Sequence, residues 1–262
     1  MNAPSTGRSS ARDRIDVNCD IGEGFGRWRM PFDAELMAMV SSVSVAAGFH
    51  AGDPSTIRRT VESAVTHGLD IGVHVGLPDL QGFGRRRLDV TAAEVRDICT
   101  YQIGAVDAFV RAAGRRLAHV KPHGALYGMI AADADLAAAL AQSVAEFDRN
   151  LRIFLLRPDQ RTILERYGVR LVVEGFPELE YDDDGMLILE REKQVWDPKS
   201  VLPRALDMID RGFVTARSGR RVSTPVETLC IHSDGPNALD IAQRLSTGLA
   251  ERGIRVAPLS AS

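Results

Sequence analysis

Cysteine is scarce in this chain of 262 residues, with only three, at positions 19, 99 and 230. The number is odd and the positions are far apart, so neither a disulfide framework nor a CxxC metal site is indicated. Scattered free cysteines are typical of a reducing compartment. We therefore expect a cytoplasmic protein.

The chain also lacks an excess of charge of one sign and any long apolar run. Its 32 Lys and Arg nearly balance 35 Asp and Glu, so nothing suggests nucleic acid or an anionic membrane as a partner. No segment reaches the ~18 continuous apolar residues of a membrane span. The first dozen residues are small and polar and lack the apolar stretch of a signal peptide. We expect a disordered tail over residues 1–12 and a single catalytic domain over residues 13–262.

Three familiar catalytic motifs are missing as well. The sequence contains no GxxxxGK[ST] phosphate loop, no GxSxG nucleophile elbow and no HExxH helix. Their absence excludes a P-loop ATP site and a nucleophile of the α/β-hydrolase type, and it leaves any metal site without a local signature.

Short β-type runs alternate with helical patterns along the chain. The predicted strands cover residues 14–18, 41–45, 70–74, 117–121, 152–156, 169–174 and 228–232. Helix signals stand between them: Asp53 and Pro54 open a helix that stops at Gly68, and Thr91 with Glu94 forms a capping box. The alternation predicts an α/β fold with a parallel sheet, closed into a seven-stranded (β/α) barrel. A doubly wound open sheet is the alternative.

Polar side chains stand at the carboxyl ends of five of these strands, where the loops begin. They are Asn18, Asp20, His50, His74, Lys121, His123, His232 and Asp234. The carboxyl ends of barrel strands meet on one rim, and residues two apart on a strand share a face. A single histidine at a strand end is more often structural, and His119, inside an apolar strand, is expected to be packed. However, four of the six histidines stand at strand ends, and this coincidence favours one shared site.

The chemistry of such a site is fairly narrow. A carboxylate with several imidazoles suits Zn²⁺ or another divalent ion. Without a metal, the same groups can act as general base and general acid. Two glycine-rich segments add to the set: "DIGEGFG" places Glu23 near Asp20, and "DLQGFGRR" precedes Arg85 and Arg86. Such arginines can hold a carboxylate or phosphate through two hydrogen bonds, although a basic run is usually a solvated surface.

Five segments together resemble a known family. They are "DVNCDIGEGFG", "AGFHAGDP", "PDLQGFGRR", "VKPHGALYG" and "CIHSDGPNA", and they resemble, in this order, the signatures of the LamB/YcsF family, the family of the 5-oxoprolinase A subunits. The resemblance runs from about residue 14 to residue 258. It implies a distorted barrel of the glycoside hydrolase/deacetylase type. It also implies ATP-dependent opening of 5-oxo-L-proline to L-glutamate, with Mg²⁺ accompanying ATP and two companion subunits.

This reaction suggests roles for the residues. A five-membered lactam is a stable amide, so water addition needs a base and a group that stabilises the oxyanion. Our hypotheses are catalytic roles for Asp20, Glu23, Lys121 and His123, substrate binding by Asn18, Arg85, Arg86 and His232, and metal binding by Asp20, His50 and His74.

The chain departs from the family's pattern at several positions that are expected to face the site. These are Ser44, Ala47, Val75 and Glu178. One alternative is therefore a side branch that acts on another lactam or amide. An ATP-independent, metal-dependent amidase or deacetylase is a second alternative, and a non-catalytic subunit that positions its partners is a third.

Overall fold

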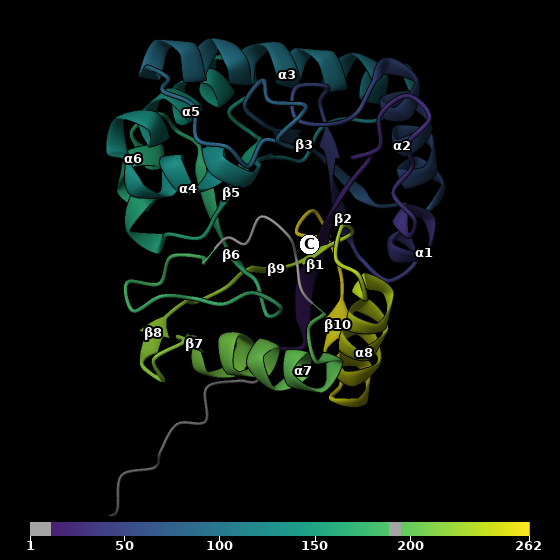
Figure 1. Ribbon diagram of the computed structural model, residues 1–262, viewed down its shortest axis with the longest axis vertical. Coiled ribbons are helices and arrows are strands. Elements are labelled where there is room, and N and C mark those ends of the chain that lie inside the picture. Colours follow the sequence, from purple (N-terminus) through teal and green to yellow (C-terminus); the bar gives the residue numbers. More distant parts are fainter. Residues whose placement is uncertain (1–11, 189–194, 262) are drawn as a thin grey trace, which may run out of the picture.

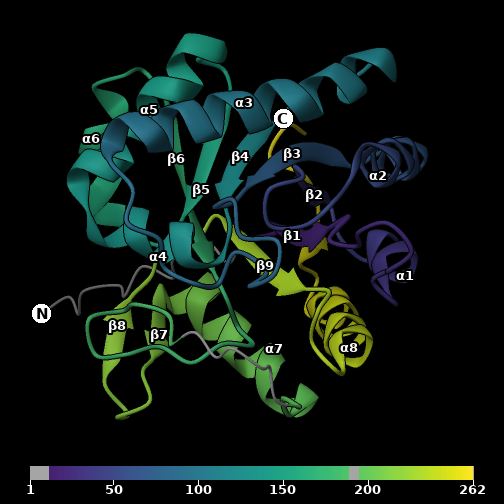
Figure 2. The same ribbon diagram turned by 45° about the horizontal axis from the view of Figure 1, so that its top comes forward.

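The computed structural model describes residues 12–188 and 195–261 (Figure 1). Residues 1–11 of the expected tail lie outside the described part, so the tail stays a prediction. The helices form an outer ring around a group of central strands (Figure 1). The same arrangement seen from a second direction places the hairpin of β7 (Phe213–Thr215) and β8 (Arg221–Ser223) beside α7 (Pro198–Leu206) (Figure 2).

Seven parallel strands form the central barrel. They are β1 (Arg14–Ile21), β2 (Ser42–Ala46), β3 (Asp70–Val75), β4 (His119–Pro122), β5 (Arg152–Leu155), β6 (Arg170–Gly175) and β9 (Thr228–His232). Each pairs with the next, and β9 pairs with both β6 and β1, which closes the ring. All seven predicted strands are present. The closed barrel is confirmed, and the open sheet is excluded.

The helices lie between successive strands, on the outside of the barrel. They are α1 (Asp33–Met37), α2 (Pro54–Thr66), α3 (Ala92–Ala112), α4 (Gly124–Ala132), α5 (Ala134–Phe147), α6 (Arg161–Glu165), α7 (Pro198–Leu206) and α8 (Ala238–Glu251). Asp53 caps α2 by accepting from the backbone N–H groups of Ser55 and Thr56, as predicted. The capping box of Thr91 and Glu94 opens α3. These local signals set where the helices begin.

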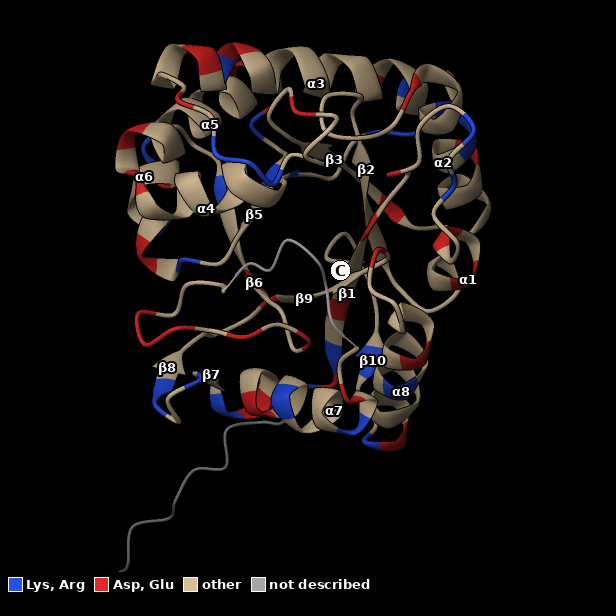
Figure 3. Ribbon diagram, viewed as in Figure 1, with Lys and Arg blue, Asp and Glu red and all other residues tan. Residues whose placement is uncertain are grey.

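Smaller elements complete the fold. The strand β10 (Arg255–Val256) pairs with the start of β1, and β7 (Phe213–Thr215) pairs with β8 (Arg221–Ser223) in an antiparallel hairpin. A 3₁₀ turn covers Pro158–Gln160, and a π-helical turn covers Asp207–Arg211. Charges of both signs are interspersed over the outer helices (Figure 3).

A membrane-spanning helix was sought within residues 12–188 and 195–261. No single helix there is both long and apolar enough to cross a membrane. The helices α4 and α5 meet those criteria only when joined, and the chain bends by 113° between them.

The interior of the barrel is polar, which distinguishes it from the usual core of branched aliphatic side chains. Along β1, Val17 and its alternate neighbours join the hydrophobic core under the helices. Between them, the side chains of Asp16, Asn18 and Asp20 are buried and bond to residues of other strands. This alternation follows from the two-residue period of a strand. It directs a column of hydrogen-bonding groups toward the rim.

Candidate active site

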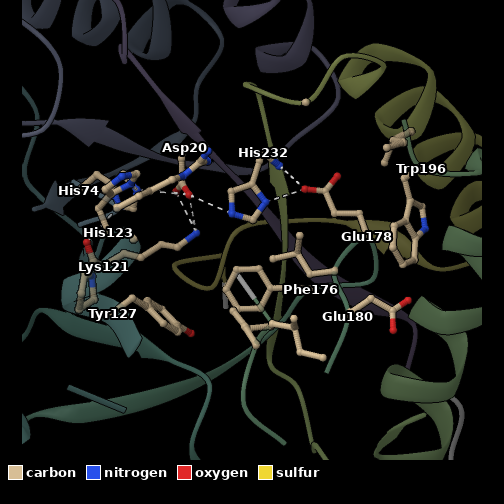
Figure 4. A pocket seen from close by; sticks show the side chains of 18 of the residues that line it. Asp20, His74, Lys121, His123, Tyr127, Phe176, Glu178, Glu180, Trp196 and His232 are labelled. Atoms are coloured by element: carbon tan, nitrogen blue, oxygen red, sulfur yellow. Dashed lines mark hydrogen bonds and ion pairs between the residues drawn. The ribbon is translucent and has the colours of Figure 1, made fainter. Parts of the chain in front are cut away.

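A pocket of about 540 Å³ opens at the carboxyl ends of the strands. One wall is built from strand-end residues: Asp20, His74, Lys121, His123 and His232. Phe176, Glu178, Glu180 and Trp196 also line the pocket, and Figure 4 shows these side chains around the same space. The predicted convergence on one rim is therefore found in the structure.

Lys121 is the centre of the buried part of this pocket. Its Nζ lies 2.8 Å and 3.0 Å from the two carboxylate oxygens of Asp20 and 2.9 Å from Oε1 of Glu174. It also donates to Oδ1 of Asn18, at 3.2 Å, and contacts Sγ of Cys230, at 2.9 Å. The ammonium group from β4 is thus held by side chains of β1, β6 and β9.

The charges in this network are mutually dependent. Burial by itself lowers the pKa of Lys121, but the charges of Asp20 and Glu174 outweigh this effect, so the pKa lies well above its usual value. Burial by itself raises the pKa of Asp20, yet Lys121 and His232 bring it below the usual value. For Glu174, burial prevails over the attraction of Lys121 and raises the pKa. Lys121 and Asp20 therefore form a charged pair at neutral pH.

Three histidines and a carboxylate lie directly beside this pair. Oε1 of Glu23 is 3.1 Å from Nε2 of His50, 3.7 Å from Nε2 of His74 and 3.3 Å from Nδ1 of His123. Nδ1 of His123 lies 2.9 Å from Nε2 of His74. All four side chains are buried, and their ligand atoms lie within 4.8 Å of one another, so the group can hold a metal ion.

Burial favours the neutral form of the imidazoles in this group. Burial lowers the pKa of His50 to about 3. Burial, together with the neighbouring histidines, keeps the pKa values of His74 and His123 well below the usual range. Neutral imidazole is the form that binds metal ions.

A second histidine arrangement lies on the other side of Asp20. Oε1 of Glu178 accepts from Nδ1 of His232, at 2.6 Å, and from the backbone N–H of the same residue, at 2.9 Å. Nε2 of His232 then faces Asp20, 3.8 Å from Oδ2 (Figure 4). A carboxylate that fixes a ring in this way selects its tautomer and direction. Glu178 is thus a positioning residue for His232.

The remaining predicted residues take different places. Asn18 is buried beneath Lys121 and does not line the pocket. Arg85 lines the pocket and pairs with Asp234. Arg86 does not line the pocket and pairs with Asp79. His119 is packed as expected, stacked on the ring of Phe154 at 4.0 Å.

Our reading of the sequence missed two carboxylates that matter to this geometry. Glu174 follows an apolar run and is the last residue but one of β6, so the rule that singled out the other strand-end residues could have found it. Glu178 was noted only as a departure from a family pattern. Nothing local signals its role, because its partner His232 is 54 residues away.

Comparisons with known proteins agree with the fold. The LamB/YcsF family model matches residues 15–262. The A subunit of 5-oxoprolinase from Methylococcus capsulatus is 47% identical, over 94% of this chain and 95% of its own length. The A subunit of 5-oxoprolinase from Bacillus cereus is 43% identical, over 92% of this chain and 97% of its own length.

The lactam utilization protein from Thermus thermophilus has the same fold, with a TM-score of 0.84 and 40% identity over 93% of this chain and 99% of its own. A putative cellobiose-phosphate cleavage protein from Enterococcus faecalis shares the fold alone, with a TM-score of 0.55, 15% identity and 94% and 97% coverage. This chain belongs to the LamB/YcsF family.

Proposed function

We propose that this chain is the A subunit of a 5-oxoprolinase and hydrolyses the cyclic amide of 5-oxo-L-proline to L-glutamate. The observation that carries the proposal is the 47% identity, over 94% of the chain, to the A subunit of the Methylococcus capsulatus 5-oxoprolinase. The word subunit in that name supports companion chains, of which we propose two. We further propose that the assembly couples the reaction to hydrolysis of ATP with Mg²⁺. The lack of a GxxxxGK[ST] loop here supports nucleotide handling with the companions.

The chemistry of the pocket supports amide hydrolysis. When water adds to the lactam carbonyl, negative charge develops on the carbonyl oxygen, and a buried cation stabilises it strongly. Lys121 is such a cation, and it borders the pocket. We assign it this role.

Proton transfers complete the reaction. Asp20 is charged and lies between Lys121 and His232, so we assign it as the base that takes the proton of the attacking water. We assign His232, oriented by Glu178 with Nε2 toward Asp20, to pass this proton from Asp20 to the ring nitrogen as the bond between that nitrogen and the carbonyl carbon breaks. The products are one carboxylate and one amine, as in glutamate.

The substrate carboxylate needs a cationic partner at the pocket. Of the two arginines that we predicted for this role, only Arg85 lines the pocket, so the assignment falls on Arg85. We expect Arg85→Gln to raise KM about 10- to 100-fold with a smaller change in kcat, because a charge-assisted hydrogen bond to substrate is lost. Steady-state kinetics of the assembled enzyme measure this. Arg87→Gln is the matched control, since Arg87 is exposed on the same loop outside the pocket; an equal effect in both variants would contradict the assignment.

The proposed function is tested by following glutamate formation from 5-oxo-L-proline. Purified chain is assayed with ATP and Mg²⁺, with and without the companion subunits from the same source. We expect turnover only with the companions and ATP, and its loss in Asp20→Asn and Lys121→Met. Turnover of the chain alone without ATP, or full activity of the assembly with Asp20→Asn, would contradict the proposal.

A further inference from the structure

Two groups of metal-ligating side chains stand next to each other within the described residues. One consists of Glu23, His50, His74 and His123, and the other of Asp20, Cys230 and His232. The second group already contains a cation, because Nζ of Lys121 lies 2.8 Å from Asp20 and 2.9 Å from Sγ of Cys230. An ammonium group in that place excludes a metal ion by charge and by volume. The first group is therefore the one to consider.

The tautomers of His74 and His123 follow from the hydrogen bonds of the ring nitrogens that face away from the ligand group. Nδ1 of His74 lies 3.1 Å from the backbone carbonyl oxygen of Lys121, and Nε2 of His123 lies 2.7 Å from that of Phe83. A carbonyl oxygen only accepts, so both of these nitrogens carry the ring proton. A neutral imidazole has one N–H, which leaves lone pairs on Nε2 of His74 and Nδ1 of His123.

These two lone pairs point at each other across 2.9 Å. Two acceptors at that distance repel unless a shared proton or a metal ion lies between them. Metal-binding histidines usually have this arrangement: one ring nitrogen binds the ion, and the N–H of the other donates to a carbonyl oxygen. With the carboxylate oxygen of Glu23 also beside both nitrogens, this arrangement points to a cation site here.

The spacing of the ligand atoms fits a tetrahedral ion. Bonds of about 2.0–2.2 Å to a four-coordinate zinc place neighbouring ligand atoms about 3.3 Å apart. The distances from Oε1 of Glu23 to the three ring nitrogens are 3.1, 3.7 and 3.3 Å, and the His74 to His123 distance is 2.9 Å. All four lie close to the tetrahedral value.

The surrounding packing holds the rings in place. His50 and His123 are stacked, with ring centroids 3.8 Å apart and planes within 7°. A Cβ atom at Gly76 would lie 2.3 Å from Nδ1 of His50, and one at Gly84 would lie 2.7 Å from the ring of His123. The two glycines thus leave room for the rings and for little else. Such a preformed ligand set loses little entropy when it binds an ion.

We propose that His50 Nε2, His74 Nε2, His123 Nδ1 and Glu23 Oε1 bind one divalent ion of the zinc class. Three imidazole nitrogens favour Zn²⁺ or Co²⁺ over Mg²⁺ and Ca²⁺, which prefer oxygen ligands. This set keeps His50 and His74 of our first hypothesis and replaces Asp20, which is paired with Lys121. His74 and His123 also border the pocket, where a bound ion would supply a Lewis acid toward a substrate carbonyl. The inference goes beyond the proposed function, and binding is measured without turnover.

The test uses the full-length protein after treatment with a chelator. Titration with Co²⁺ is expected to saturate at one ion per chain and to give the intense visible bands of tetrahedral cobalt. No near-ultraviolet thiolate band should appear, because Cys230 is not a ligand. Zn²⁺ is expected to displace the cobalt, and elemental analysis should then find one zinc per chain.

Substitutions of the proposed ligands and of control residues test where the ion binds. His50→Gln and His123→Gln should each weaken Co²⁺ and Zn²⁺ binding at least tenfold, with circular dichroism showing that they fold. Cys230→Ser and His67→Gln should bind as the unaltered chain does, since His67 is an exposed histidine at the end of α2. Three results would overturn the proposal: no stoichiometric ion in the unaltered chain, a thiolate band that disappears in Cys230→Ser, or unchanged affinity in folded His50→Gln. None of them depends on 5-oxoproline turnover.

Discussion

Asp16 lies on the same strand as the pocket residue Asp20 but near the opposite end of the barrel. Its carboxylate accepts from Oγ of Ser41, at 2.7 Å, and from Oγ1 of Thr228, at 2.6 Å. Burial nevertheless prevails over these bonds and raises its pKa from 3.8 to about 6. The same Thr228 hydroxyl accepts from Asn18, which in turn accepts from Lys121. A continuous line of hydrogen bonds therefore links Asp16 to the pocket.

The raised pKa of Asp16 predicts how stability varies with pH. Between pH 4 and pH 6 the folded chain holds a proton at Asp16 that the unfolded chain has lost, so the free energy of unfolding falls as pH rises through this window. The fall is at most about 1.4 kcal/mol per pH unit. Asp16→Asn removes this contribution. Urea unfolding of both proteins at several pH values measures it, since the effect of Asp33, whose pKa is also about 6, cancels in the difference. A difference that stays constant from pH 4 to pH 6 would refute this account.

At the scale of elements, the pairing of β3 with β4 depends on one small residue. Gly72 is the register partner of His119, and a Cβ atom at Gly72 would lie 2.2 Å from Nε2 of the His119 ring. The ring fills the barrel interior, stacks on Phe154 and bonds to Oγ of Ser44 at 3.0 Å. Glycine is thus needed because a neighbouring ring occupies the space that its side chain would take.

A double-mutant cycle tests this packing. We expect Gly72→Ala to lower the free energy of unfolding by about 1–3 kcal/mol, the usual cost of overpacking. In a His119→Ala background the same substitution should cost close to nothing, because the ring is gone. Denaturant unfolding of the four proteins gives the coupling energy; equal costs in both backgrounds would show that the ring is not the obstacle.

The start of α2 makes a second prediction at this scale. Asp53 caps the helix and also accepts from the backbone N–H of Gly26, at 3.0 Å, so it ties the helix to the loop after β1. Asp53→Ala should cost about 1 kcal/mol of stability at pH 7. Asp53→Asn is the matched control, since its side-chain oxygen can still cap, and should cost less. Thermal and urea unfolding compare the two, and an equal loss would mean that capping is not the cause.

At the scale of the whole molecule, closure of the barrel assembles the site. The ammonium of Lys121 on β4 reaches Asp20 on β1, 101 residues away in the sequence, and Glu174 on β6. These strands are not neighbours in the sheet. Their side chains meet because a closed barrel turns alternate residues of every strand toward one axis.

Closure also predicts an uneven distribution of stability. The strand β1 pairs with β2, β9 and β10 and is almost fully buried. The hairpin of β7 and β8 consists of two strands of three residues each, paired with one another. Hydrogen exchange should be at least about 100-fold slower in β1, through global unfolding, than in the hairpin, which opens locally. Similar protection in both would argue against closure as the main source of stability.

The sequence by itself determined the strands, the helix starts and the polar residues at the carboxyl ends of the strands. Apolar runs and caps are local, so the seven strands, the start of α2 and the positions of Asp20, His74, Lys121 and His232 at strand ends were all predictable. The tertiary structure alone decided which of these side chains touch. Arg85 lines the pocket and Arg86 does not. Lys121 pairs with Glu174, and Glu178 bonds to His232. The reason is physical: hydrophobic period and capping act over a few residues, whereas contacts across a barrel depend on closure and on the stagger of its strands.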